Sequence, residues 1–512
     1  MSEGKVWLVG AGPGDAGLLT LRGKQVLDEA QVVVYDALVS PGVLNMIPDT
    51  AQVIFAGKRS GNHHLKQSEI NRILLEQAQK GFRVVRLKGG DPFLFGRGGE
   101  ELELLAEHGI PFEIVPGVTS AFAVPAYQGI PVTHRDYCSS VHVVTAHRRA
   151  DHSCEIDFSA LVKTKGTLIF LMGIVALPDI CKGLLDAGMD GDTPAAVLEW
   201  GTTAAQRRIS ATLATLEEKA RRSGAKAPGI IVVGRVCALA ERFAWYEKRP
   251  LAGVRVLVTR PKELASTLAL LLRQRGAEVL ELSAICTRPI ADSGALEECI
   301  RILEQGGYDW LVFTSPSGVR IFFEKLLSWS DVRALGGVKV AALGQGTQKA
   351  LRQYGIKADF LPSVYDGETL GKELAEICES GARILIPRAA IGNHGLIDGL
   401  EQGDHLQITD LPTYDTVYES SRVIDERGLL EAGEIDFAVF TSASTVKGFA
   451  AAVGDMDFTK ICAVCIGPQT EAAARSFGMR TWRSEKATLE SLAECVERSA
   501  DEIRNGSREE RI

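Results

Sequence analysis

Residues 9–15 read Val-Gly-Ala-Gly-Pro-Gly-Asp and lie between two different periodic patterns. An apolar strand pattern at 6–9 precedes them, and a helical pattern begins near Leu18. A glycine-rich turn between a strand and a helix exposes backbone N–H groups, which an anionic or zwitterionic ligand can approach closely. The sequence therefore predicts an α/β domain with a ligand-binding turn near its start.

The same turn also invites comparison with a dinucleotide-binding fingerprint. A second strand pattern at 32–35 ends in Asp36, where a dinucleotide site would use a carboxylate to bind a ribose. That fingerprint needs a third glycine, however, and Asp15 stands in its place, while Pro13 occupies a position of ordinary backbone. We therefore expect a different kind of ligand loop and keep a nicotinamide-dependent oxidoreductase as the alternative hypothesis.

Further unusual segments follow other strand patterns in the first half. The strand pattern at 83–87 leads into residues 88–100, Lys-Gly-Gly-Asp-Pro-Phe-Leu-Phe-Gly-Arg-Gly-Gly-Glu, and residues 116–121 read Pro-Gly-Val-Thr-Ser-Ala. The remaining segments of this set are 35–36, 57–59, 129–137, 172–173 and 199–202. Taken together, and in this order, they resemble the uroporphyrinogen III C-methyltransferase family over residues 4–245.

This resemblance implies a two-lobed tetrapyrrole-methylase fold for residues 1–245, with S-adenosyl-L-methionine as the cofactor. It implies two methylations of uroporphyrinogen III, at carbons 2 and 7, to give precorrin-2, and a homodimer formed through this half. The residues that would contact the cofactor are Pro13, Gly89, Gly90, Asp91, Leu94, Thr119, Ser120, Met172 and Gly201. The alternatives are core packing for Met172 and a helix or turn cap for Gly201. Trp200 stands where the family commonly has Asn.

Methyl transfer is an in-line displacement, so the protein mainly positions donor and acceptor and excludes water. The resemblance implies Asp36 as the proton acceptor and Lys58 as a proton donor or charge partner. The alternative for Asp36 is a cap at the strand end. Basic residues that could pair with substrate carboxylates, or instead be surface charges, are Arg59, His63, Arg97, His134 and Arg135.

A break at 246–253 separates the first half from a second, internally duplicated half. Residues 309–319, Asp-Trp-Leu-Val-Phe-Thr-Ser-Pro-Ser-Gly-Val, are echoed at 436–446 by Asp-Phe-Ala-Val-Phe-Thr-Ser-Ala-Ser-Thr-Val. Leu-Gly-Gln-Gly-Thr at 343–347 is echoed by Ile-Gly-Pro-Gln-Thr at 466–470. We therefore expect two similar α/β lobes.

With 256–261 and 414–416, these segments resemble uroporphyrinogen III synthase over residues 254–503. The two expected lobes are 254–284 with 418–503, and 288–412, joined by a two-strand hinge. The family closes hydroxymethylbilane to uroporphyrinogen III with its last ring inverted, a step that would directly precede the methylation. A non-catalytic two-lobed binding module is the alternative.

Tyr414 is the candidate catalytic residue of this half, because a phenol on the hinge could hydrogen-bond the departing hydroxyl. Its alternative role is packing in the cleft wall. Hydroxyl residues that would line a cleft between the lobes, or act only as helix N-caps, are Ser315, Thr347, Ser442 and Thr470.

The composition sets limits on partners and compartment. A net charge of −8 and a pI near 5.7 argue against nucleic acid or an anionic membrane as the main partner, so small-molecule tetrapyrroles are expected. No signal peptide or membrane-spanning segment is expected, and the ten dispersed cysteines favour a reducing, cytoplasmic location. Neither the cysteines nor the histidines have metal-ligand spacing, so no metal is predicted. The charged tail at 504–512 is predicted to be disordered.

Overall fold

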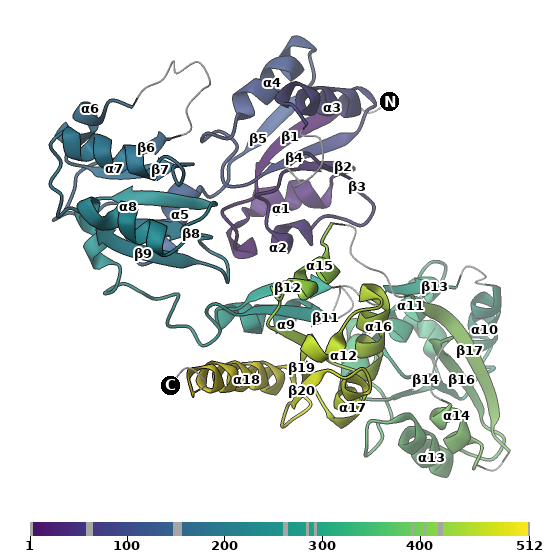
Figure 1. Cartoon of the computed structure of the whole chain (residues 1–512). Helices are drawn as coiled ribbons and strands as arrows, with labels where there is room; N and C mark the ends of the chain where they lie inside the picture. The colour runs from purple at the N-terminus through teal and green to yellow at the C-terminus, as the bar shows by residue number, and fades with distance from the viewer. Residues whose placement is uncertain are drawn as a thin grey trace. The chain divides into compact units, whose positions relative to one another are not determined.

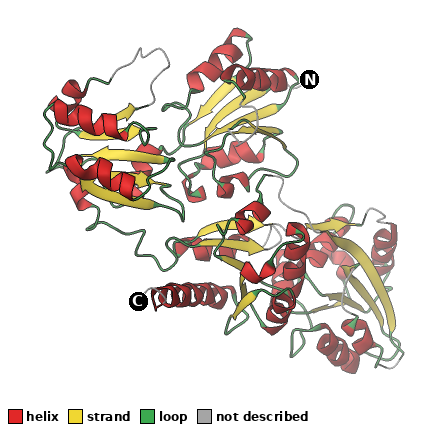
Figure 2. Ribbon diagram, in the orientation of Figure 1, coloured by secondary structure: helices red, strands yellow, loops and turns green. Residues whose placement is uncertain are grey.

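The computed structural model describes residues 4–57, 65–146, 156–259, 265–282, 286–290, 294–390, 394–403, 405–417 and 423–509. These residues form an α/β protein with four five-stranded sheets (Figures 1 and 2), which confirms the predicted fold class. The chain divides into two compact units, residues 1–282 with 420–512, and residues 283–419. No helix in the described ranges is long and apolar enough to cross a membrane.

The first sheet contains five parallel strands in the order β3-β2-β4-β1-β5. They are β1 (Lys5–Gly10), β2 (Val32–Tyr35), β3 (Gln52–Phe55), β4 (Arg83–Lys88) and β5 (Phe112–Val115). Two helices pack on each face, α1 (Leu21–Asp28) and α2 (Pro41–Leu44) on one, and α3 (Gln67–Gln79) and α4 (Gly98–Glu107) on the other. The β2 strand is apolar and buried on both faces, as expected for a parallel sheet between two helical layers.

The strand order bears on the dinucleotide alternative. In the Rossmann order, the first two strands are neighbours and the ribose-binding carboxylate follows the second. Here β4 lies between β1 and β2, so the turn after β1 and Asp36 after β2 are separated by the turn after β4. The topology therefore disfavours a nicotinamide site.

The second sheet is mixed and has the order β6-β7-β10-β8-β9. Its strands are β6 (Val141–Thr145), β7 (Thr167–Leu171), β8 (Pro194–Glu199), β9 (Arg207–Thr212) and β10 (Gly229–Val233). The helices of this lobe are α5 (Ser120–Tyr127), α6 (Phe158–Lys163), α7 (Leu177–Asp186) and α8 (Leu213–Arg222). The α7 and α8 helices share one apolar cluster with the sheet, while α5 and the 3₁₀ turn Arg235–Leu239 share the other.

The third sheet is parallel, in the order β12-β11-β18-β19-β20. Its strands are β11 (Arg255–Thr259), β12 (Glu278–Leu282), β18 (Phe437–Phe440), β19 (Cys462–Cys465) and β20 (Arg480–Arg483). Its helices are α9 (Ala265–Gln274), α15 (Glu426–Glu431), α16 (Ala443–Val453), α17 (Pro468–Ser476) and α18 (Leu489–Glu509). The α9 and α18 helices pack together on one face of this sheet.

The predicted disorder of the tail is wrong for residues 504–509, because α18 continues to Glu509. The Arg504 guanidinium donates hydrogen bonds to the carbonyl oxygens of Pro250 at 2.9 Å and Ala252 at 2.6 Å. Ile503, one residue earlier, packs against the apolar cluster under this helix. These long-range contacts hold a charged helix end that has no apolar pattern of its own. Residues 510–512 lie outside the described ranges.

The fourth sheet belongs to the second unit and has the order β13-β17-β16-β14-β15, with β13 antiparallel. Its strands are β13 (Cys286–Pro289), β14 (Trp310–Phe313), β15 (Lys339–Ala342), β16 (Arg383–Ala389) and β17 (Gln407–Val417). Its helices are α10 (Gly294–Glu304), α11 (Pro316–Leu326), α12 (Gln345–Gln353), α13 (Gly367–Ile377) and α14 (Gly395–Leu400). Pro289 on β13 pairs with Tyr414 on β17, so the expected hinge strands are partners.

The internal duplication is visible as a repeated strand, turn and helix. β14 and α11 in one lobe correspond to β18 and α16 in the other, and β15 and α12 correspond to β19 and α17. In both lobes a serine caps the first of these helices: Ser315 Oγ accepts from Gly318 N at 3.0 Å, and Ser442 Oγ accepts from Thr445 N at 3.2 Å. The two predicted lobes are thus confirmed.

Candidate functional site

Three glycine turns meet at the carboxyl edge of the first sheet. Gly12 and Gly90 exchange two backbone hydrogen bonds, with N···O distances of 3.2 and 2.7 Å. A Cβ atom on Gly10 would lie 2.4 Å from Gly117 Cα, so the first and third turns approach too closely for a side chain. The structure therefore brings the predicted cofactor turns after β1, β4 and β5 together.

Asp91 joins the second and third of these turns. Its Oδ1 atom accepts hydrogen bonds from Phe93 N at 2.8 Å and Leu94 N at 3.1 Å, and its Oδ2 atom accepts from Gly117 N at 3.0 Å. The sequence predicts that Asp91 accepts from donors of the ligand. In the structure both of its oxygens bind backbone, so Asp91 shapes the turns that would surround a ligand.

Asp36 lies in the turn after β2, next to the Gly-Gly turn. Its Oδ1 atom accepts a hydrogen bond from Leu38 N at 3.0 Å, so it does cap the strand end. A Cβ atom on Gly89 would lie 2.6 Å from the Leu38 side chain, which places the turn of Asp36 directly against Gly89. The Asp36 side chain is 24% exposed, so the cap does not remove it from solvent or ligand.

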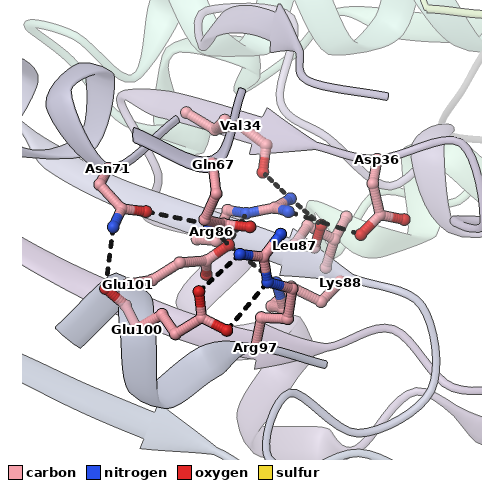
Figure 3. A network of polar contacts seen from close by, with 10 residues as sticks. All are labelled: Val34, Asp36, Gln67, Asn71, Arg86, Leu87, Lys88, Arg97, Glu100 and Glu101. Carbon is pink, nitrogen blue, oxygen red and sulfur yellow. Dashed lines mark hydrogen bonds and ion pairs between the residues drawn. The ribbon is translucent and has the colours of Figure 1, made fainter. Parts of the chain in front are cut away.

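A cluster of charged side chains is buried behind Asp36 (Figure 3). Glu101, which is fully buried on α4, accepts on its Oε1 atom from Arg86 Nε at 3.1 Å and Lys88 Nζ at 2.8 Å. Arg86 Nη2 lies 3.6 Å from Asp36 Oδ2. Burial and the neighbouring Arg86 lower the pKa of Lys88. This cluster was not predicted from the sequence, although Arg86 and Lys88 among the apolar residues of β4 were a usable signal.

The second lobe contributes loops with an unusual backbone. Met172, Trp200 and Thr202 have positive φ angles of 55°, 47° and 68°. Met172 is 50% exposed and Trp200 is 47% exposed, so the core-packing alternative for Met172 is wrong. A Cβ atom on Gly201 would lie 2.3 Å from Val124 Cγ1, so this glycine allows the loop to pack on α5. Strained residues with exposed apolar side chains are typical of ligand sites.

Two contacts connect the second lobe with the first glycine turn, one from the loop of Thr202 and one from the end of α5. Asp15 N donates to Thr202 Oγ1 at 3.1 Å, and Tyr127 OH donates to Asp15 Oδ2 at 2.7 Å. Burial raises the pKa of Tyr127, which keeps this phenol protonated as the donor. The half-buried Pro13 lies in the turn that these contacts hold.

The remaining predicted cofactor residues lie where the two lobes of this half meet. Leu94 packs against the apolar cluster of α5 and the second sheet. Thr119 caps α5, accepting from Ala121 N at 3.2 Å, and Ser120 is the first residue of that helix. The turn after β4 is therefore in contact with the second lobe.

The predicted basic residues are divided between separate loops. Arg97 precedes α4, has a φ angle of 57° and donates from Nε to Glu100 Oε1 at 2.9 Å. His134 accepts from Asp136 N at 3.2 Å and packs on Tyr137, and Arg135 beside it is exposed. Lys58, Arg59 and His63 lie outside the described residues. Among the described residues, no group of three or more His, Cys, Asp or Glu could hold a metal ion.

In the second unit, Tyr414 and Ser315 are brought together. Tyr414 is 5% exposed on β17, and its hydroxyl lies 2.7 Å from Ser315 Oγ at the start of α11. Burial raises the pKa of Tyr414, so the phenol stays protonated. A neutral pair of hydroxyl groups thus stands at the end of β14, beside the hinge strand.

The other hydroxyl residues have different environments. Thr347 and Thr470 are buried at the third positions of α12 and α17, whose cap positions are Gly344 and Gly467, so neither threonine is an N-cap. Thr347 belongs to the same unit as Tyr414, whereas Thr470 and Ser442 belong to the other unit. Ser442 Oγ also lies 2.8 Å from Ser444 Oγ.

Comparison with known proteins identifies both halves. Residues 5–217 match the model of the tetrapyrrole (corrin/porphyrin) methylases, and residues 266–494 match that of uroporphyrinogen-III synthase HemD. The chain is 46% identical over 494 residues to the porphyrin biosynthesis protein HemD of Ruminiclostridium josui, covering 96% of this chain and 97% of that protein. It belongs to this family, and it is an enzyme that joins a tetrapyrrole methyltransferase to a uroporphyrinogen-III synthase.

Two further proteins that the chain resembles are methyltransferases. The uroporphyrinogen-III C-methyltransferase of Bacillus subtilis is 40% identical over 358 residues, covering 70% of this chain and 73% of that protein. The crystal structure of uroporphyrin-III C-methyl transferase from Thermus thermophilus, complexed with S-adenyl homocysteine, is 39% identical, with a TM-score of 0.40. It covers 46% of this chain and 93% of that protein.

Proposed function

We propose that the second half cyclises hydroxymethylbilane to uroporphyrinogen III, and that the first half methylates this product at carbons 2 and 7 to give precorrin-2. The family membership of both halves supports this order, because the product of the synthase is the substrate of the methyltransferase. The observation that carries the methylation step is the position of Asp36 against Gly89, at the edge where three glycine turns meet.

The turns of the first half fit S-adenosyl-L-methionine, which supplies an electrophilic methyl group when bound. Gly90 has a φ angle of 69°. A Cβ atom on Gly90 would lie 4.0 Å from its nearest neighbour, Ser120 N, so the space beside this backbone is open. The exposed Met172 and the partly buried Leu94 would offer apolar contacts to the cofactor. Asp91, Thr119 and Gly201 keep the surrounding loops in place.

Asp36 receives the proton that methylation releases. When a pyrrole carbon forms its bond to the methyl group, the ring system becomes cationic and must lose a proton to restore conjugation. Asp36 Oδ1 is bound to Leu38 N, so Oδ2 is the atom that accepts this proton. Arg97 and Arg135 are placed on loops of this half and would pair with substrate carboxylates, together with His134.

Tyr414 assists departure of hydroxide in the second half. Its protonated phenol donates a hydrogen bond to the leaving hydroxyl, and Ser315 holds the phenol in position from 2.7 Å away. Tyr414 lies on β17 opposite Pro289 of β13, and the shape of the site around it would enforce inversion of the last ring.

Residues 246–253 join the two halves of the chain. Tyr246 packs on Tyr127 of the first half with ring centroids 5.2 Å apart, and Leu251 is fully buried in the core of the third sheet. We expect a fragment of residues 1–247 to methylate uroporphyrinogen III and a fragment of residues 251–512 to cyclise without cofactor. If neither fragment is active, this boundary is wrong.

We also propose that the protein is cytoplasmic and forms a homodimer through its first half, as the family resemblance implies. The described cysteines are free thiols, which suits a reducing compartment. Sedimentation of the full chain and of residues 1–247 tests the dimer, because both should sediment as dimers. A dimeric full chain with a monomeric fragment would move the interface to the second half.

Incubation of the purified full chain with hydroxymethylbilane tests the proposed function. Without S-adenosylmethionine the product should be uroporphyrinogen III, and with it the product should carry two added methyl groups. The control without enzyme gives the non-inverted isomer I. Methylation of added uroporphyrinogen III without any cyclisation would show that the second half is a binding module. Binding of a nicotinamide cofactor in place of S-adenosylmethionine, measured by calorimetry, would favour the oxidoreductase.

A further inference from the structure

The two oxygens of Asp36 have different environments. Oδ1 accepts a hydrogen bond from Leu38 N at 3.0 Å, whereas Oδ2 faces Arg86 Nη2 at 3.6 Å. The second distance is that of an ion pair rather than a hydrogen bond. Oδ2 is therefore oriented by a cation and still has lone pairs for an incoming proton.

Arg86 is fixed by the other atoms of its guanidinium group. Nε donates to Glu101 Oε1 at 3.1 Å, and Nη1 donates to the backbone carbonyls of Leu87 at 3.0 Å and Val34 at 3.4 Å (Figure 3). Its side chain is 4% exposed. A guanidinium held at several points in a buried site has little freedom to move. It can therefore fix the position of the Asp36 carboxylate that it faces.

Arg86 is also the cation near Asp36 whose charge changes least with pH. The described charged groups near Asp36 are Arg86 and Lys88 on β4 and Glu101 on α4. Burial lowers the pKa of Lys88, while an arginine stays protonated in proteins. Glu101 balances part of this positive charge from the interior, since it is fully buried and binds both cations.

We propose that Arg86 is a positioning residue for methyl transfer: anchored by Glu101, it fixes the orientation of the Asp36 carboxylate, whose Oδ2 accepts the departing proton. This proposal rests on the proposed role of Asp36 as the proton acceptor. It assigns a function to Arg86, a buried charged residue among the apolar residues of β4, and to the buried Glu101 behind it.

The first test compares kcat with KM in Arg86 variants of the full chain. Arg86→Met should lower kcat for methylation about 10- to 100-fold, the cost expected when a reacting group is misplaced. KM for uroporphyrinogen III and the S-adenosylmethionine affinity should stay within about threefold, and Arg86→Lys should recover most of the lost rate. Arg83→Met is the matched control, since Arg83 lies exposed on the same strand and bonds to Glu29 O. A wild-type kcat for Arg86→Met would overturn the proposal.

The decisive test is a double-mutant cycle with Asp36→Asn. If Arg86 acts through Asp36, then adding Arg86→Met to Asp36→Asn should change kcat by less than about twofold. Losses that multiply would show a structural role for Arg86 and overturn this proposal alone. A wild-type rate for Asp36→Asn itself would overturn the proposed function as well. If melting shows that Arg86→Met does not fold, the pair Arg86→Met with Glu101→Gln, which removes one buried cation together with one buried anion, replaces it in the cycle.

Discussion

In the first half, Asp36 faces Arg86 and, behind it, the buried Glu101, whereas in the second half Tyr414 faces the hydroxyl of Ser315. The first arrangement is built from full charges and the second from neutral groups. The difference follows from the proposed reactions. Methylation releases a proton that a fixed anion can accept, while cyclisation releases hydroxide, which a neutral donor can assist. Charged groups that position the carboxylate should therefore matter in the first half, and the shape of the site should matter in the second half.

The largest expected effect is on cofactor binding. Asp91→Ala should abolish measurable S-adenosylmethionine binding, because the carboxylate accepts three backbone hydrogen bonds that hold two glycine turns together. Hydrogen bonds to a charged group are worth about 1.5–3 kcal/mol each, so the affinity should fall more than about 1,000-fold. Calorimetry measures this loss, and Asp136→Ala, at an exposed carboxylate, is the control. Wild-type affinity in Asp91→Ala would remove Asp91 from the site.

The next effect separates binding from turnover. Asp36→Asn should slow methylation by about two to four orders of magnitude, the usual range for a lost proton acceptor, and should leave S-adenosylmethionine affinity largely intact. Steady-state rates and calorimetry on the same protein provide both values. Equal loss of binding and turnover would instead place Asp36 on the cofactor and weaken the contrast between the two halves.

A moderate effect is expected at the neutral site, the hydroxyl pair of Tyr414 and Ser315. Tyr414→Phe should slow consumption of hydroxymethylbilane about tenfold, in line with the loss of one hydrogen bond, yet the enzymatic product should remain isomer III. Tyr308→Phe is a matched control, because Tyr308, just before β14, is similarly buried and its hydroxyl bonds to Thr409 Oγ1 at 3.3 Å. Enzymatic formation of isomer I by Tyr414→Phe would show that the phenol also directs inversion.

The neutral site should also be insensitive to moderate alkali. The pKa of Tyr414 is raised above its ordinary value of 10.0 by burial, so the phenol keeps its proton when the pH is below 10. We therefore expect the cyclisation rate to stay level from about pH 7 to about pH 9. An alkaline loss of rate in this range that disappears in Tyr414→Phe would contradict the assignment of a protonated donor.

The smallest effects are expected at the other hydroxyl groups of the synthase half. Ser442→Ala and Thr470→Ala should each reduce cyclisation less than about tenfold, since one neutral hydrogen bond is worth about 1 kcal/mol. Ser442→Ala should in addition lower the melting temperature, because it removes the cap of α16. A complete loss of cyclisation at either position, in a folded protein, would place the chemistry on the other lobe.

The predictable parts of this molecule were local in sequence. Strand, glycine turn and helix follow one another within short segments, so the turns at 9–15 and 88–100 and the duplicated Thr-Ser turns could be recognised. The placement of β4 between β1 and β2 depends on long-range packing and could not. The same applies to the contact of Arg86 with Glu101 and to the helical tail, which Arg504 attaches to residues about 250 positions earlier.

The most direct test of the contrast between the halves follows one substrate through the full chain. Hydroxymethylbilane and S-adenosylmethionine are given to the wild type, to Asp36→Asn and to Tyr414→Phe, and the tetrapyrroles are identified over time. Asp36→Asn should form uroporphyrinogen III at the wild-type rate and accumulate it without methylation. Tyr414→Phe should form it slowly and methylate all of it. Accumulation of unmethylated product by Tyr414→Phe, or slow cyclisation by Asp36→Asn, would contradict the division of chemistry between the two sites.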